Sequence, residues 1–144
     1  MARAAELERI AMLYVEGLLT ADGSAVPFSD DVRRSHLIVV PGVPLAWQVA
    51  QGADVVRADF THERLTARRN MRITVDSDRG SVVLLWESGM ESEFARAITI
   101  VDRFVIVDGL IREIEIISIP QGGSFGQVPY ADWDTMVRTT QAQG

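Results

Sequence analysis

The sequence predicts an α+β fold in which helices pack on one face of a curved antiparallel or mixed sheet. An amphipathic segment opens the chain, short helical segments follow it, and consecutive strand-like segments fill most of the second half. Helices and strands that are segregated along a chain, instead of alternating, are typical of this class. With 144 residues, 47% of them hydrophobic and 24% charged, the chain fits one globular domain over residues 1–144.

The net charge and the residue types that are missing narrow the kinds of partner and site. A formal charge of −6 argues against a nucleic-acid partner, which needs a concentrated basic face. There are no cysteines and only two histidines, so we expect no metal and no cofactor. No apolar run approaches the ~20 residues that span a bilayer, and no secretory pattern opens the chain. We therefore expect a cytoplasmic protein with no membrane partner.

The first element is an amphipathic helix over residues 4–20, whose apolar residues recur at three- and four-residue steps. These residues are Leu7, Ile10, Ala11, Tyr14 and Leu18. Gly23 follows the last turn and is expected to adopt the left-handed conformation that ends the helix. Residues 27–31 are expected to form a short irregular segment.

The next part of the chain gives weaker signals. Residues 32–40 predict a strand with weak alternation, and the pattern leaves open which face points inward. Pro44 suits the first turn of a short helix over residues 44–51, and residues 54–60 predict another turn or two of helix. A cleaner strand follows over residues 65–75, with Arg69 on its apolar side, and a nearly continuous apolar strand spans residues 81–88 and is expected to be central.

A long antiparallel hairpin over residues 94–119 organises the predicted sheet. Asp108-Gly109 interrupts two apolar runs, and an Asp-Gly pair suits a type I′ turn. In the first arm the residues of one face alternate as Ile98, Ile100, Asp102, Phe104 and Ile106. A carboxylate in that series must be solvated, paired or protonated, because burying it as an unpaired ion is costly.

The second arm carries two glutamates, and a tail follows it. Glu113 and Glu115 are assigned to one face together with Ile111 and Ile117, interpreted as a solvated or dimer-facing surface. Residues 120–144 predict a Gly-rich loop and a short C-terminal helix that begins near Pro129.

At this point the chain resembles the nuclear transport factor two-like superfamily, whose fold is called the cystatin-like cone and whose branches include SnoaL-like cyclases and ketosteroid isomerases. The segments that carry the resemblance are LYVEGLLTADGSAVPFSDDV, which starts at Leu13, and IVDRFVIVDGLIREIEI, which starts at Ile100. The resemblance covers most of residues 5–119, implies a sheet wrapped around N-terminal helices, and leaves the tail outside. It also implies a homodimer formed through the outer sheet face.

The resemblance to ketosteroid isomerases assigns roles to three residues. In that family a tyrosine and a protonated aspartic acid donate hydrogen bonds to the substrate carbonyl, and Tyr14 and Asp102 match these positions. Where the family has an aspartate base, this chain has His36. The expected pocket lining comprises Trp47, Arg69, Met71, Trp86, Ile100 and Phe104. The implied activity is acid–base chemistry on a small apolar carbonyl compound, as in an isomerase, cyclase or lyase.

Each of these residues also has a structural interpretation that the sequence leaves open. Tyr14 suits a helix core position, and His36 suits a hydrogen-bonded structural histidine. Asp102 could pair with Arg69, Arg72 or Arg96. The alternative function is accordingly a non-catalytic binding or dimerisation domain that holds an apolar metabolite.

Overall fold

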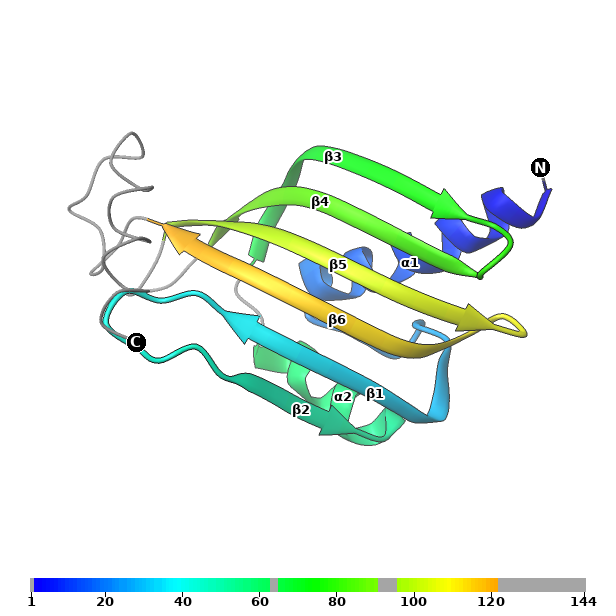
Figure 1. Cartoon of the computed structure of the whole chain (residues 1–144), viewed down its shortest axis with the longest axis horizontal. Helices are drawn as coiled ribbons and strands as arrows, with labels where there is room; N and C mark the ends of the chain where they lie inside the picture. The colour runs from blue at the N-terminus through cyan, green and yellow to red at the C-terminus, as the bar shows by residue number, and fades with distance from the viewer. Residues whose placement is uncertain (1, 63–64, 91–95, 122–144) are drawn as a thin grey trace.

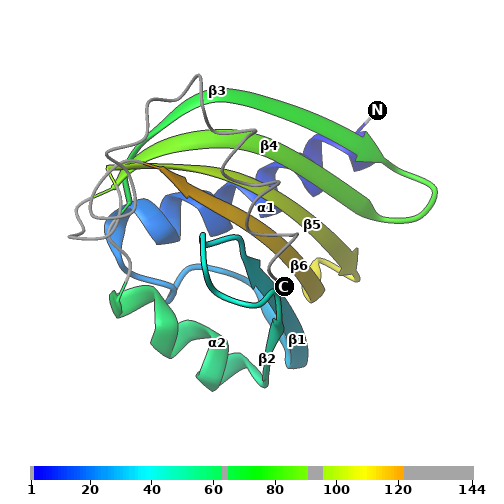
Figure 2. The same ribbon diagram turned by 60° about the vertical axis from the view of Figure 1, so that its left-hand side comes forward.

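The computed structural model describes residues 2–62, 65–90 and 96–121. Six strands form one curved sheet in the order β2-β1-β6-β5-β4-β3, and α1 and α2 both lie on one side of it (Figures 1 and 2). Strands β1 and β6 pair in parallel, and every other neighbouring pair is antiparallel, which makes the sheet mixed. The elements are α1 (Ala2–Thr20), β1 (Phe28–Ile38), β2 (Trp47–Gln51), α2 (Ala53–Asp59), the 3₁₀ turn η1 (Phe60–His62), β3 (Leu65–Asp76), β4 (Ser81–Met90), β5 (Ala97–Val107) and β6 (Leu110–Gln121).

Helix α1 ends as predicted near residue 20, but the residue with the left-handed conformation is not the predicted one. Ala21, and not Gly23, has the positive φ angle of 55°. The Asp22 N–H donates to the Gly17 carbonyl at 2.9 Å and the Ala21 N–H to the Leu18 carbonyl at 3.3 Å, which is a Schellman ending. Gly23 serves a different purpose, because a Cβ at that position would lie 3.0 Å from the Phe60 ring.

The prediction of a short helix over residues 44–51 is wrong, because strand β2 occupies this part of the chain. Residues Trp47–Gln51 pair antiparallel with β1, where Ser35 lies opposite Val49. Pro44 supplied a local helix signal, but a five-residue segment gains its backbone partners from the exposed edge of β1, and this pairing overrides local propensity. The helical segment predicted over residues 54–60 is confirmed as α2 and the turn after it.

The strands β3 and β4 are present as predicted, with two differences. Asn70 has a positive φ of 54°, and the register shifts between Arg69 and Arg72, so a bulge interrupts β3. Strand β4 lies between β5 and β3 as an interior strand, but its apolar run is not buried on both faces. Val83 and Leu85 are exposed on the outer face, where Leu85 keeps 38% of its accessible surface.

The hairpin of β5 and β6 is confirmed in detail. Asp108 and Gly109 have φ angles of 53° and 77°, as a type I′ turn requires. The register shifts by one residue between Val105 and Ile106, which leaves Arg112 as an extra residue in β6. Ile111 therefore faces the core, on the opposite side from Glu113 and Glu115, and its predicted placement beside them is wrong.

The core lies between the inner sheet face and the helices, and aromatic rings form its centre. The Tyr14 ring meets Phe28, Phe60 and Phe104 edge to face, at centroid distances of 6.4, 5.3 and 5.1 Å. Across the described ranges, no helix is long and apolar enough to cross a membrane. The predicted C-terminal helix lies outside the described residues.

Candidate functional site

Asp102 lies in the middle of the inner sheet face and has no exposed surface. Its Oδ2 atom accepts a hydrogen bond of 2.8 Å from the indole N–H of Trp86, a residue that is also fully buried. The arginines considered as structural partners, Arg69, Arg72 and Arg96, are all exposed. The sheet therefore holds a carboxyl group away from bulk solvent, and burial by itself disfavours the charged form of a carboxyl group.

The strand register brings His36 close to Asp102. Ile116 of β6 lies opposite His36 of β1 on one side and opposite Asp102 of β5 on the other. We call these three residues the inner-face row. Adjacent strands are ~4.8 Å apart, so the backbones of His36 and Asp102 are separated by roughly 10 Å across the row.

The His36 side chain is half-buried and has a defined hydrogen bond. Its Nε2 lies 2.7 Å from the hydroxyl oxygen of Ser118, a buried residue of the inner face. This contact answers the question that the sequence left open, because it shows that His36 and its even-numbered neighbours in β1 point inward. Burial, which has the largest effect, and the positive charge of Arg34 both lower the pKa of His36, the negative charge of Asp59 partly opposes them, and the net result is a pKa of about 4. The imidazole is neutral at neutral pH.

Arg34 and Asp59 form an ion pair next to His36. Arg34 faces inward on β1, one step along the strand from the inner-face row, and Asp59 is the last residue of α2. The guanidinium Nη2 donates to the Asp59 carboxylate. The Arg34 side chain is 15% exposed and that of Asp59 is 44% exposed, so the arginine lies deeper than its partner.

Tyr14 lies over the neighbouring row of the sheet. Its side chain is 2% exposed and packs on Phe104, which pairs with Ile114 in the register next to Ile116 and Asp102. The helix position predicted for Tyr14 is thus on the core side of α1, facing the inner sheet surface. The three residues expected to carry chemistry, Tyr14, His36 and Asp102, all point into the space between sheet and helices.

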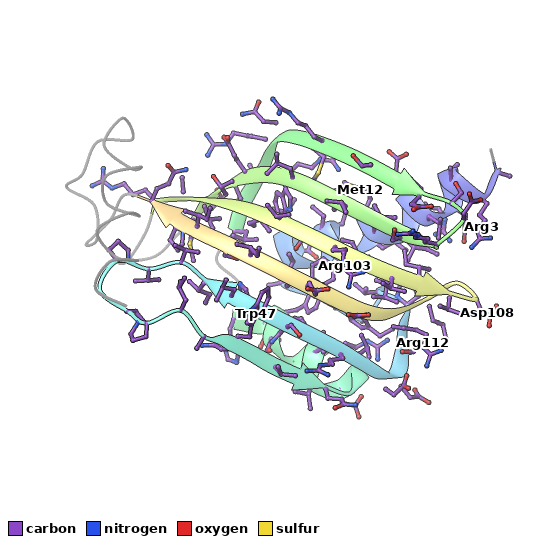
Figure 3. The ribbon with its side chains drawn as sticks, in the orientation of Figure 1. Arg3, Met12, Trp47, Arg103, Asp108 and Arg112 are labelled. Carbon is purple, nitrogen blue, oxygen red and sulfur yellow. The ribbon has the colours of Figure 1, made fainter. Side chains whose placement is uncertain are left out.

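The expected pocket lining divides into two groups. Trp86, Ile100 and Phe104 are buried on the inner face, and Met71 packs against the same core. Met71 and Trp86 also line a hollow of about 340 Å³ with Asn70, Arg72, Leu85, Glu87 and Thr99, but Leu85 belongs to the outer face, and Tyr14, His36 and Asp102 are not among the lining residues. Trp47 is not part of the interior: it is 48% exposed, and Figure 3 shows it on the sheet side away from the helices. Arg69 is also exposed, because it precedes the bulge at Asn70.

Sequence reasoning missed Ser118, Arg34 and Asp59. Ser118 interrupts the apolar series Ile114 and Ile116 in the same way that Asp102 interrupts its own strand, so the signal was present in the sequence. Arg34 and Asp59 had no comparable signal, because their contact joins residues 25 positions apart. Within the described part of the chain, no group of three or more histidine, aspartate or glutamate side chains could hold a metal ion.

Comparisons with known proteins agree with this architecture. Residues 2–118 match the model of a family described as a domain of unknown function, DUF8021. No curated protein matches the chain.

Solved structures with the same fold include several of unknown function. An NTF2-like protein from Burkholderia xenovorans LB400 superposes with a TM-score of 0.65 at 11% identity, covering 93% of this chain and 95% of the other. A cystatin-like protein from Methylobium petroleophilum PM1 gives 0.60 at 16% identity, covering 90% of each chain. A protein from Bacillus subtilis that is named as a candidate isomerase gives 0.58 at 11% identity, covering 78% of this chain and 88% of the other. At these identities the likeness establishes the NTF2-like, cystatin-like fold.

Proposed function

This chain belongs to the DUF8021 family and has an NTF2-like fold, and we propose that it is an enzyme that performs acid–base chemistry on a small carbonyl compound. The observation that supports the proposal most is the fully buried carboxyl group of Asp102, which lies on the inner sheet face and is separated from His36 by the intervening strand β6. Such paired environments, one favouring a neutral acid and the other a neutral base, are what proton transfer at neutral pH requires. The candidate isomerase of the same fold is consistent with it.

In the proposed mechanism Asp102 is protonated and stabilises the substrate oxygen. Because the Trp86 N–H donates to Oδ2, the proposed mechanism places the proton of the neutral carboxyl group on Oδ1. This O–H, together with the Tyr14 hydroxyl, donates to the carbonyl oxygen as negative charge develops on it. Donors that are oriented before the reaction stabilise an enolate oxygen without reorganisation.

His36 is the proposed base. Its neutral imidazole removes a proton from the carbon next to the carbonyl, which gives an imidazolium ion and an enolate, and then returns the proton to the substrate. In this role Nε2–H donates to Ser118 and Nδ1 accepts the substrate proton. A pKa of about 4 makes the imidazole a weak base but its conjugate acid a strong proton donor, so the return step is favoured.

Deuterium exchange tests the proposal without knowledge of the final product. Enolisable ketones in D₂O are followed by ¹H NMR with the native protein and with Asp102→Asn, Tyr14→Phe and His36→Gln. We expect native exchange, with losses of about 100-fold in the Asp102 and His36 variants, the size seen when an oxyanion donor is removed. Ser35→Ala, the next residue of β1 on the outer face, serves as the control and should keep full activity. Equal exchange in all variants contradicts the proposal.

A second candidate is a binding domain for an apolar carbonyl metabolite without catalysis. The enclosure of Tyr14 by three aromatic rings favours it, since a ring fixed in this way is well suited to packing. The two candidates differ in one result. If the protein only binds its ligand, the Tyr14 and Asp102 variants should bind the ligand with altered affinity. The native protein should then show no deuterium exchange above that in buffer.

We further propose that the protein acts as a homodimer in the cytoplasm, without a nucleic-acid or membrane partner. The exposed apolar side chains Val83 and Leu85 on the outer sheet face support a protein partner there. The charge of −6 supports the absence of a nucleic-acid partner.

A further inference from the structure

Arg34 is an inward-facing cation that the proposed reaction does not use. It lies opposite Ile114 in the row next to His36, so its backbone is roughly 12 Å from that of Asp102 by strand geometry. Its Nη2 atom donates to Asp59, but its Nε atom is buried and has no hydrogen-bond partner among the described residues. A buried guanidinium N–H without an acceptor costs free energy that a ligand oxygen would recover.

The charge balance around Arg34 favours an anion as that ligand. Arg34 lies deeper than Asp59, whose carboxylate is 44% exposed and therefore partly solvated. At His36, the lowering effect of the Arg34 charge on the pKa is larger than the raising effect of Asp59. At the position of His36, the positive charge of Arg34 thus outweighs the negative charge of Asp59, although the whole chain carries a charge of −6.

We propose that Arg34 binds a carboxylate group of the ligand, which narrows the substrate class to carbonyl compounds that also carry a carboxylate. The carbonyl half of this statement rests on the proposed function, whereas the carboxylate half rests on Arg34 alone. A ligand carboxylate oxygen would accept a hydrogen bond from the Nε–H group. This hydrogen bond would be charge-assisted, and such hydrogen bonds are stronger than those between neutral groups. The ligand carboxylate would then lie at Arg34, in the row of the sheet next to the one that holds His36, Ile116 and Asp102.

Binding of such a ligand also changes the proposed base. The charged groups that face His36 are Arg34 on its own strand and Asp59 on α2, while Gln48 of β2 and Ser118 of β6 are neutral neighbours. A carboxylate at Arg34 offsets the positive charge that lowers the pKa of His36. The substrate would thereby make His36 a stronger base.

A matched pair of probes tests the inference through binding alone. Calorimetric titration compares 4-acetylbenzoate with 4-acetylbenzamide, which has the same shape but no charge. We expect the native protein to bind the carboxylate about tenfold more tightly, the value of one charge-assisted hydrogen bond. Arg34→Gln should abolish this preference, and Arg34→Lys should keep part of it. In NMR titrations of the native protein, the carboxylate probe and not the amide should raise the pKa of His36.

Arg33→Gln is the control, because Arg33 is the exposed neighbour on the same strand and carries the same charge. It should leave the preference for the carboxylate unchanged. Three results would each overturn the inference. The two probes could bind the native protein with equal affinity, the preference for the carboxylate could survive in Arg34→Gln, or neither probe could bind at about 10 mM, a concentration at which weak ligands are detected. If the preference is present but ketones show no deuterium exchange, the inference stands and the proposed enzyme function falls.

Discussion

Asp102 and His36 are two ionisable side chains of the inner sheet face, and their environments differ. Asp102 has no exposed surface, and its Oδ2 atom accepts a hydrogen bond from the Trp86 indole. His36 is half-buried, bonded to Ser118, and lies in the field of Arg34. Burial favours the neutral form of both groups, and for a proton-transfer site this gives an acid and a base at the same pH.

The first prediction at this scale concerns the charge on His36. NMR titration should show a pKa near 4, far below the ordinary value. Arg34→Gln should raise the pKa of His36 because it removes a positive charge, and Asp59→Asn should lower it because it removes a negative one. A pKa of His36 near 6.5 that neither substitution moves would show that its burial and ion pair have no effect.

The same shift predicts how stability depends on pH. The unfolded chain binds a proton at His36 near pH 6.5, but the folded chain does so only near pH 4. This contribution to the free energy of unfolding is therefore present above pH 6.5 and is lost as the pH falls toward 4, by at most about 3 kcal/mol. Denaturant unfolding at pH 7 and pH 4.5 measures it. The loss should be smaller in His36→Gln, and an identical loss would contradict the assignment.

At the scale of elements, small residues determine where α1 ends and how closely it packs against Phe60. Ala21 adopts a left-handed conformation that favours glycine. Ala21→Gly should therefore raise the free energy of unfolding by about 1 kcal/mol in chemical denaturation. Ala5→Gly, the same change at an exposed position inside the helix, should lower it by a similar amount. Destabilisation by both changes would contradict the assigned helix ending.

A second prediction for this element concerns Gly17. A Cβ there would lie 2.8 Å from the Phe60 ring and 3.0 Å from the Asp22 carbonyl oxygen. Gly17→Ala should cost about 1–3 kcal/mol through overpacking, even though alanine favours helix. The additional change Phe60→Leu should recover part of this loss in a double-mutant cycle. Strict additivity of the two changes would show that the contact is not the cause.

The elements that the sequence predicted best are those with local signals. The hairpin follows from Asp108-Gly109 and period-two alternation, and both lie within a few residues of the turn. Strand β2 and the bulge at Asn70 were not predicted, because partner strands impose them. The site follows the same division. Asp102 was visible as a break in an apolar series, but the row with His36 depends on the parallel pairing of β1 with β6, which joins distant segments.

At the scale of the whole molecule, the sheet separates two surfaces with different roles. The inner face holds the core and the candidate site. The outer face carries Arg103, paired with Glu113 and Glu115, and Figure 3 shows Arg103 on the side away from the helices. Apolar side chains such as Leu85 lie on this face as well. This outer face is the surface through which we propose that two copies of the chain associate.

The prediction for this scale is a dimer that depends on the outer face. Sedimentation at micromolar concentration should give twice the chain mass of 15.9 kDa for the native protein. Leu85→Asp, on the outer face, should give a monomer because it would bury an unpaired charge. Val55→Asp, on an exposed position of α2, should leave the dimer intact. A native monomer would contradict the proposed assembly.

The central claim is that Asp102 is a neutral acid on the inner face, and its titration tests this most directly. The ¹³Cγ resonance of Asp102 is assigned by comparison with Asp102→Asn. It is then followed from about pH 4 to about pH 9, the range in which exposed and buried carboxyl groups titrate. We predict that the carboxyl group remains protonated through neutral pH. Ionisation near pH 4, as for an exposed aspartate, would contradict the claim and leave Asp102 a structural residue.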